Sequence, residues 1–261
     1  MKLAPVNCCI VFFLSLSFVS NTWSQPPRKY QKIHSKRLVV ENKNQDKHVL
    51  FERSENAATI IREMMDAPDR GIPQSILDRA VCVAVFPSVK KGGFGIGGQW
   101  GRGVASCRFE NKGWSTPAFL NLSGGSFGFQ IGAEVADVVL IINSRSGMNS
   151  ILKSRLGIGA GAEATAGIFG RGAGIGTDAM LGSGIFSYSR SRGLFAGLEL
   201  KGAMLTEDKK ANEIMYGRRH THEMLSSEKM ANDPLVRTYP QALSEVSPMK
   251  AIYVRVREVK K

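Results

Sequence analysis

Glycine alternates with strand-forming residues along much of this chain, and this constrains the fold more than any other feature. The alternation recurs in four segments, at 92–103, 123–134, 156–176 and 181–202. In a strand it puts large side chains on one face and glycine on the other. Glycine inside a strand costs stability, so it usually marks a bend, a bulge or a close approach of backbones. We therefore expect an α+β fold: a glycine-rich, strongly twisted antiparallel sheet or partial β-barrel with flanking helices.

Hydrophobic periodicity predicts the other elements. Leu50, Ala57, Ile61 and Met64 recur at helical spacing and predict an amphipathic helix over 50–66, ended by Pro68. Strands are expected at 81–86 (closed by Pro87), 136–143 and 251–261, and helices at 73–80, 147–154, 206–217 (capped by Thr206, ended by Gly217) and 221–229.

The N-terminus has the pattern of a secretory signal peptide. Lys2 precedes an apolar run at 8–19, shorter than the about 20 residues of a membrane-spanning helix. We predict a signal peptide at 1–24, cleaved after Ser24, with an uncleaved anchor as the alternative. Residues 25–48 are predicted to be a basic flexible linker, and 49–261 a single domain. The protein is expected to be exported to the periplasm or cell envelope, or secreted.

The chain is strongly basic, with a formal net charge of +13, or +12 after cleavage. This favours anionic partners such as lipid headgroups, other polyanions or nucleic acid, and export disfavours nucleic acid. Closely spaced cations are candidates for binding phosphate oxygens, with ordinary solvated charge as the alternative. The candidate lipid-binding residues are Arg28, Lys29, Lys32, Lys36, Arg37, Lys90, Lys91, Arg190 and Arg192.

Two cysteines, Cys82 and Cys107, remain after the predicted cleavage. In an oxidising compartment they can form one disulfide, and two buried free thiols are the alternative. The pair His220 and His222 supplies at most two metal ligands, so no metal site is expected. No cofactor is expected either.

Two glycine motifs match patterns found in catalytic or cofactor-binding sites, but the residues that follow them do not fit those patterns. Gly93, Gly95 and Gly98 fit a dinucleotide fingerprint, but a strand pattern follows where a helix is needed, so a hairpin is expected. The segment 124–128 places Ser126 in a nucleophile-elbow pattern, again followed by a strand, so a tight turn between strands is expected. We predict that the protein is not an enzyme.

Three blocks of sequence resemble the SYLF domain family: AVFPSVKKGGFGIGGQWGRGV (84–104), GWSTPAFLNLSGGSFGFQIGAEVADVVLIIN (113–143) and YSRSRGLFAGLELKGAMLTEDKKANEIMYG (188–217). The resemblance runs over about 57–217. It implies binding without catalysis. Eukaryotic members bind phosphoinositides, and some bind actin filaments; bacterial members are commonly exported and resemble envelope lipid-binding proteins. The helix predicted at 50–66 departs from the family because it is net acidic, and the basic segment before it is expected to substitute.

These observations predict an exported, membrane-associated member of that family that binds anionic phospholipid, phosphoinositide-like or of the envelope, through basic surface residues. The alternative is an envelope structural or interaction protein with a protein partner such as an actin-like filament.

Overall fold

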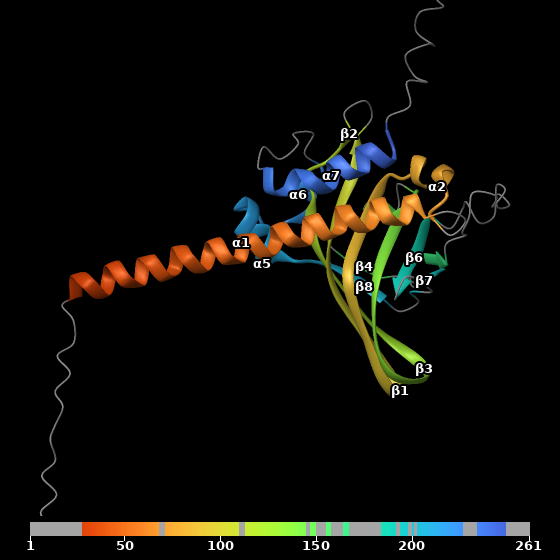
Figure 1. Cartoon of the computed structure of the whole chain (residues 1–261), viewed down its shortest axis with the longest axis horizontal. Coiled ribbons are helices and arrows are strands. Elements are labelled where there is room, and N and C mark those ends of the chain that lie inside the picture. The colour runs from red at the N-terminus through yellow and green to blue at the C-terminus, as the bar shows by residue number, and fades with distance from the viewer. Residues whose placement is uncertain are drawn as a thin grey trace, which may run out of the picture. The chain divides into compact units, whose positions relative to one another are not determined.

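The computed structural model describes residues 28–67, 71–109, 113–144, 147–149, 155–157, 164–166, 184–191, 194–197, 200, 203–226 and 234–248. The chain divides into two compact units, 1–41 and 42–261, and the second contains the whole sheet (Figure 1). The predicted signal peptide and the predicted strand at 251–261 lie outside the described residues.

The longest helix, α1, runs from Arg28 to Asp66. Its end agrees with the prediction, but its start does not, because the segment 28–48 is helical where a flexible linker was expected. The reason is in the sequence: no glycine or proline interrupts 28–66, and lysine, arginine, glutamine and glutamate are good helix formers. Among the described residues, no helix is both long and apolar enough to cross a bilayer.

The remaining helices are short and follow local signals. They are α2 (Gln74–Asp78), α5 (Lys209–Tyr216), α6 (Thr221–Leu225) and α7 (Pro234–Val246). The α5 helix is capped by Asp208, whose side chain accepts a hydrogen bond from the Ala211 N–H, and it ends at Gly217 with φ 68°. Thr206, the predicted cap, lies in a strand instead. The α7 helix was not predicted.

Eight strands form one sheet, most of them in antiparallel pairs. They are β1 (Cys82–Phe109), β2 (Gly113–Trp114), β3 (Ala118–Ile142), β4 (Arg155–Gly157), β5 (Ala164–Ala166), β6 (Ile185–Ser191), β7 (Leu194–Gly197) and β8 (Ala203–Glu207). The order is β2-β1-β3-β6-β5; β7 also pairs with β6, and β8 pairs with both β3 and β4. The pair β5–β6 is parallel.

Strands β1 and β3 pair along almost their whole length, from Cys82 opposite Ile142 to Ala105 opposite Ala118. The strand predicted to close at Pro87 therefore continues. A bulge between Phe86 and Val89 takes Pro87 out of the ladder, where its missing N–H costs no hydrogen bond. The hairpin expected around Gly93, Gly95 and Gly98 and the turn expected at 124–128 are also wrong, since both segments lie inside continuous strands.

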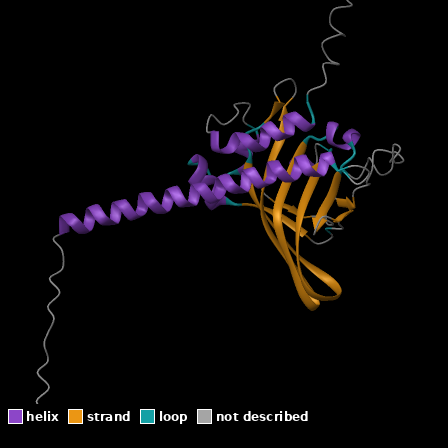
Figure 2. Ribbon diagram, viewed as in Figure 1, coloured by secondary structure: helices purple, strands orange, loops and turns teal. Residues whose placement is uncertain are grey.

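The β1–β3 ribbon turns back on itself at the end of the sheet remote from the helices (Figure 2). Glycines permit the close approach: a Cβ atom on Gly103 would lie 2.3 Å from the Val85 carbonyl oxygen, and one on Gly101 would lie 2.7 Å from Val89 Cγ2. The two halves of β3 consequently have different neighbours, β8 at 120–124 and β6 at 137–142.

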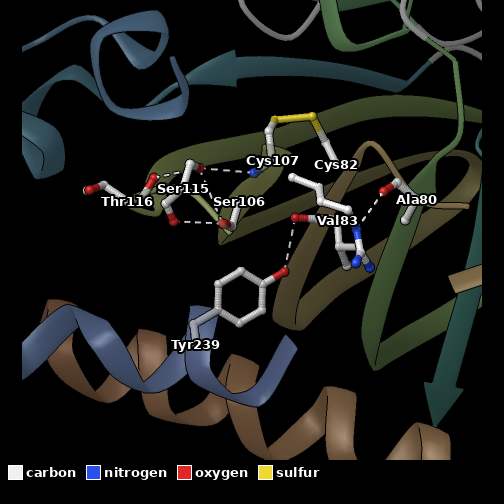
Figure 3. The surroundings of a disulfide bond; sticks show 9 residues. Ala80, Cys82, Val83, Ser106, Cys107, Ser115, Thr116 and Tyr239 are labelled. Carbon is white, nitrogen blue, oxygen red and sulfur yellow. Dashed lines mark hydrogen bonds between the residues drawn. A yellow bond between two sulfur atoms is a disulfide. The ribbon is translucent and has the colours of Figure 1, made fainter. Parts of the chain in front are cut away.

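Cys82 and Cys107, near the two ends of β1, form a disulfide (Figure 3). From the sequence alone, a disulfide and two buried free thiols were both possible. Beside the disulfide, the Cys107 N–H donates to Ser115 Oγ at 3.0 Å, and the Tyr239 hydroxyl of α7 donates to the Val83 carbonyl at 3.0 Å. These bonds attach the segment between β2 and β3 to the end of β1, and the α7 helix to its start.

The sheet is buried on both faces, as side-chain alternation along β1 requires. Val83 and Val85 pack in a cluster with residues of α1, α2, α5 and α7. Ala84 and Phe86 point the other way, into a cluster enclosed by the sheet and completed by α6. The predicted α+β class, with a twisted, mainly antiparallel sheet, is confirmed, and the sheet is open, not a closed barrel.

Candidate functional site

Five side chains of β1, β3 and β8, two of them basic and three apolar, are exposed, and we name this set the outer patch: Lys90, Trp100, Arg102, Val135 and Met204. Trp100 and Met204 are each 46% exposed and Val135 is 54% exposed. Large apolar residues elsewhere along β1, such as Val85 and Val104, are fully buried. This patch is therefore the place in the described sheet where apolar side chains meet solvent beside unpaired cations.

The sequence QWGRG, at 99–103, dictates the orientation of the two β1 residues in the middle of the patch. Gly101 and Gly103 face inward, against Val89 and Val85, where a larger residue has no room. Trp100 and Arg102 alternate with these glycines and must point outward. Both side chains are exposed, and the Arg53 guanidinium of α1 lies over the ring of Phe119, 5.4 Å from its centroid.

Strand register places Trp100 and Met204 on the same face. Trp100 lies opposite Ser123 of β3, and Ser123 lies opposite Met204 of β8. Side chains directly opposite each other in antiparallel strands share a face. The small Ser123 between them leaves both larger side chains exposed.

The remaining two residues of the outer patch are Lys90 and its partner on β3, Val135. A Cβ on Gly101 would lie 3.4 Å from the Val89 Cα, so the backbones of the two halves of β1 touch here. Lys90 follows Val89 and Trp100 precedes Gly101 in the chain. Both side chains are exposed, and each is the chain neighbour of a residue in this contact.

The Arg102 guanidinium lies over the Trp100 ring, 5.1 Å from its centroid. No carboxylate pairs with Arg102 or Lys90 among the described residues. The charge of Arg102 also acts on Arg53, whose pKa is lowered chiefly by burial and further by Arg102, against the opposing effect of Asp208.

The other predicted cations are placed differently. Lys91 is half-buried opposite Glu134; burial lowers its pKa, and the Glu134 charge opposes this. The five N-terminal candidates, Arg28, Lys29, Lys32, Lys36 and Arg37, all lie in α1, but their side chains are outside the described residues, as is the whole of Arg192.

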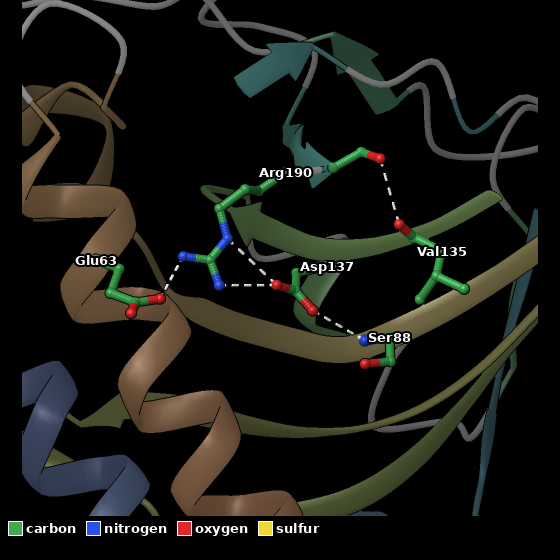
Figure 4. A network of polar contacts seen from close by, with 6 residues as sticks. Glu63, Ser88, Val135, Asp137 and Arg190 are labelled. Carbon is green, nitrogen blue, oxygen red and sulfur yellow. Dashed lines mark hydrogen bonds and ion pairs between the residues drawn. The ribbon is translucent and has the colours of Figure 1, made fainter. Parts of the chain in front are cut away.

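Arg190, a predicted lipid-binding residue, is instead the centre of an ion network (Figure 4). Its guanidinium donates to Asp137 Oδ2 from Nη2 at 2.8 Å and from Nε at 3.3 Å, and it also pairs with Glu63 of α1. Asp137 accepts in addition from the Ser88 N–H, at 2.9 Å, in the bulge of β1. The arrangement links β1, β3, β6 and α1, which makes Arg190 a structural residue.

Within the described residues, neither the Ser126 motif nor the His220 and His222 pair forms a catalytic or metal-binding site. Ser126 lies in the continuous strand β3, without the strand-to-helix turn that a nucleophile elbow needs. His220 lies 3.4 Å from Glu207 Oε1 and stacks near His222, and no group of three metal-ligating side chains occurs in the part of the chain that the structure describes.

Sequence reasoning missed Trp100, Arg102, Val135 and Met204. The glycine alternation of QWGRG contained the signal for Trp100 and Arg102, because it forces both onto one face. Val135 and Met204 could not be found in this way, because their exposure depends on where the helices end and on the register of β3 with β8.

Comparison with known proteins supports the resemblance noted in the sequence. Residues 123–246 match the Ysc84 family, described as Las17-binding protein actin regulator. Protein YSC84 of Saccharomyces cerevisiae is 32% identical over 200 residues, which cover 72% of this chain and 42% of that protein. LAS seventeen-binding protein 3 of the same species is 33% identical over 171 residues, 64% of this chain and 37% of that protein.

SH3 domain-containing YSC84-like protein 1 of Mus musculus is 33% identical over 173 residues, which cover 64% of this chain and 51% of that protein. The match thus spans about half, or less, of the length of these curated relatives. The family predicted from the sequence blocks is confirmed: the chain contains a domain of the Ysc84, or SYLF, family.

Proposed function

We propose that this protein is a non-catalytic binding protein that associates with anionic phospholipid surfaces through exposed basic side chains. The observation that carries the proposal is the state of the cations. Arg53, Arg62 and Arg190 are paired with carboxylates, whereas Lys90 and Arg102 are exposed without such a partner among the described residues. Such cations, in a chain of net charge +13, attract phosphate groups at a membrane surface.

The proposed location is outside the cytoplasm, in the periplasm or cell envelope, or in the secreted fraction. The disulfide between Cys82 and Cys107 supports this, because disulfides persist in oxidising compartments and are rare where thiols are kept reduced. The apolar run at 8–19 supports it independently.

Vesicle flotation tests the lipid proposal. We expect the full chain to float with vesicles of phosphatidylglycerol and phosphatidylcholine and to bind pure phosphatidylcholine much more weakly. The variant Lys90→Glu/Arg102→Glu is expected to lose most of the preference. The apolar run at 8–19 is common to all variants and contributes equally to them.

Arg237→Glu is a matched control, because Arg237 is also exposed and lies on α7, away from the patch. The double control variant Arg237→Glu/Lys210→Glu changes the net charge by the same amount as Lys90→Glu/Arg102→Glu. Equal loss in both double variants would attribute binding to net charge alone. Equal flotation of the unaltered chain with both vesicle types would overturn the proposal.

A second candidate function is supported by the family description and by the name of LAS seventeen-binding protein 3. In this alternative the domain binds a protein partner of that kind or an actin-like filament. Co-sedimentation with actin filaments tests it: binding that survives detergent and lipid removal supports the alternative, and absence of the protein from the filament pellet argues against it.

A further inference from the structure

We propose that the outer patch docks on a bilayer by insertion, with Trp100, Val135 and Met204 entering the headgroup layer while Lys90 and Arg102 contact lipid phosphates. The inference rests on the proposed function and deepens it by naming the surface that faces the membrane and the way it is held there. Charge attraction alone leaves a protein above the headgroups; apolar side chains hold it in the interface.

The first argument is the arrangement of side chains across three neighbouring strands. Trp100 and Met204 share a face through Ser123, and Val135 lies opposite Lys90. The strands hold these positions rigidly, unlike side chains on a loop. Each of these two groups therefore holds an apolar and a cationic side chain next to each other.

The second argument is the pairing of Trp100 with Arg102. A tryptophan ring is apolar but carries one N–H donor, so it prefers the boundary between headgroups and acyl chains. The guanidinium over its face, at 5.1 Å, remains charged and keeps N–H donors suited to a phosphate. The pair can thus place its ring among the upper acyl carbons and its charge among the phosphates.

The third argument is that burial within the domain does not account for these exposed residues. Arg53 of α1 lies over Phe119, which is one row of side chains from Arg102 and two rows from Trp100. Within the described residues, the other large apolar side chain with comparable exposure is Val49, on α1. Among the sheet side chains that the structure describes, the exposed large apolar ones therefore belong to the same set as Lys90 and Arg102.

Charge favours a bilayer over a second copy of the chain as the occupant. A two-fold contact through this surface would bring Lys90 and Arg102 of one copy against the same residues of the other, and no described carboxylate pairs with them. Anionic headgroups, in contrast, complement both cations.

Tryptophan fluorescence tests insertion directly. The chain has three tryptophans; Trp23 is replaced by phenylalanine in all variants, and Trp114 is 2% exposed, so Trp100 reports the contact. On vesicles of phosphatidylglycerol and phosphatidylcholine we expect a blue shift of the emission, with quenching by lipids brominated near the headgroup end of the acyl chain. The additional change Trp100→Phe should abolish the shift and keep most of the binding.

The double variant Trp100→Ser/Met204→Ser should bind the same vesicles at least about tenfold more weakly. Val49→Ser is the control, because it removes a similarly exposed apolar side chain (50%) outside the patch, and it should bind normally. Circular dichroism and thermal unfolding of each variant confirm that the fold is kept.

The outcomes separate this inference from the proposed function. If the parent chain binds anionic vesicles without a blue shift, and the serine variant binds equally well, insertion is wrong and electrostatic binding stands. If the parent chain does not prefer anionic vesicles, the proposed function itself fails. If the serine changes abolish dimers seen by analytical ultracentrifugation and leave vesicle binding unchanged, the patch is an interface between copies and the inference is overturned.

Discussion

Cys82 and Cys107 lie 25 positions apart in the same strand, yet their Cα atoms are 3.9 Å apart and their sulfur atoms are bonded. A straight strand would separate them by about 80 Å, at roughly 3.3 Å per residue. The disulfide is therefore a direct consequence of the reversal of the β1–β3 ribbon, and it closes the loop that contains the β1 half of the outer patch.

Removing the disulfide should lower stability without changing the fold class. For a closed loop of this length, loss of the constraint on the unfolded chain corresponds to roughly 3–4 kcal/mol. We expect that decrease in the free energy of unfolding for Cys82→Ala/Cys107→Ala, measured by urea denaturation. The oxidised and chemically reduced forms of the parent chain should differ in the same direction; an unchanged urea midpoint on reduction would contradict the prediction.

The close approach at Gly103 gives a second prediction. Its Cβ would lie 2.3 Å from the Val85 carbonyl oxygen and 2.5 Å from Phe86 Cδ1, so Gly103→Ala should cost about 1–3 kcal/mol of stability through overpacking. Gly98→Ala is the matched control on the same strand, because the nearest atom to its Cβ would be 3.9 Å away. Thermal unfolding of the two variants checks this prediction. Equal melting temperatures would show that β1 accommodates a methyl group at position 103 without loss of stability.

The glycine pattern predicted the coiled, twisted strands because alternation and the cost of glycine are local properties. It could not distinguish a hairpin from a strand that continues and turns back together with its partner. That choice depends on the register of β1 with β3, whose paired residues extend from Ala105 opposite Ala118 to Cys82 opposite Ile142, and no local pattern fixes it. The strand end predicted at Pro87 was wrong for a similar reason. The missing N–H of Pro87 costs no hydrogen bond, because the bulge at 86–89 removes this residue from the ladder.

The candidate site was predictable only in part. Lys90 was predicted from the Lys90-Lys91 pair before a glycine segment, and its side chain is exposed; its role in binding stays a prediction. Arg190 looked equivalent in sequence, but its partners, Glu63 and Asp137, come from α1 and β3, which lie 127 and 53 positions away. Such partners are set by tertiary packing, and the local pattern around Arg190 contains no sign of them.

Replacement of Arg190 tests its structural assignment. Arg190→Gln removes the charge opposite Asp137, whose side chain is only 20% exposed, so we expect a loss of about 1–3 kcal/mol from the partly buried carboxylate left without its ion pair. Urea denaturation measures the loss. Binding to anionic vesicles should stay within a factor of about two of the parent chain, in contrast to Lys90→Glu/Arg102→Glu. A strong loss of vesicle binding in a folded Arg190→Gln variant would instead support the original prediction that Arg190 binds lipid.

The Asp208 side chain both pairs with Arg53 and caps α5, and different substitutions of Asp208 separate these two contributions to stability. One carboxylate oxygen pairs with Arg53 of α1 at 3.2 Å, and the other accepts from the Ala211 N–H at the start of α5 at 3.1 Å. Asp208→Asn keeps a side-chain cap, since asparagine caps helices about as well as aspartate, but it leaves the Arg53 charge buried and unpaired. Asp208→Ala loses both and should be less stable than Asp208→Asn by about 1 kcal/mol, the usual value of a cap.

The two losses can be assigned by repeating both changes in an Arg53→Met background. There the unpaired charge is gone, so Asp208→Asn should become nearly neutral, whereas Asp208→Ala should still cost about 1 kcal/mol for the cap. Free energies of unfolding from urea denaturation of the six chains complete the cycle. If Asp208→Asn costs the same with and without Arg53, the ion pair does not contribute to joining α1 to α5, and the cap alone explains the position of Asp208.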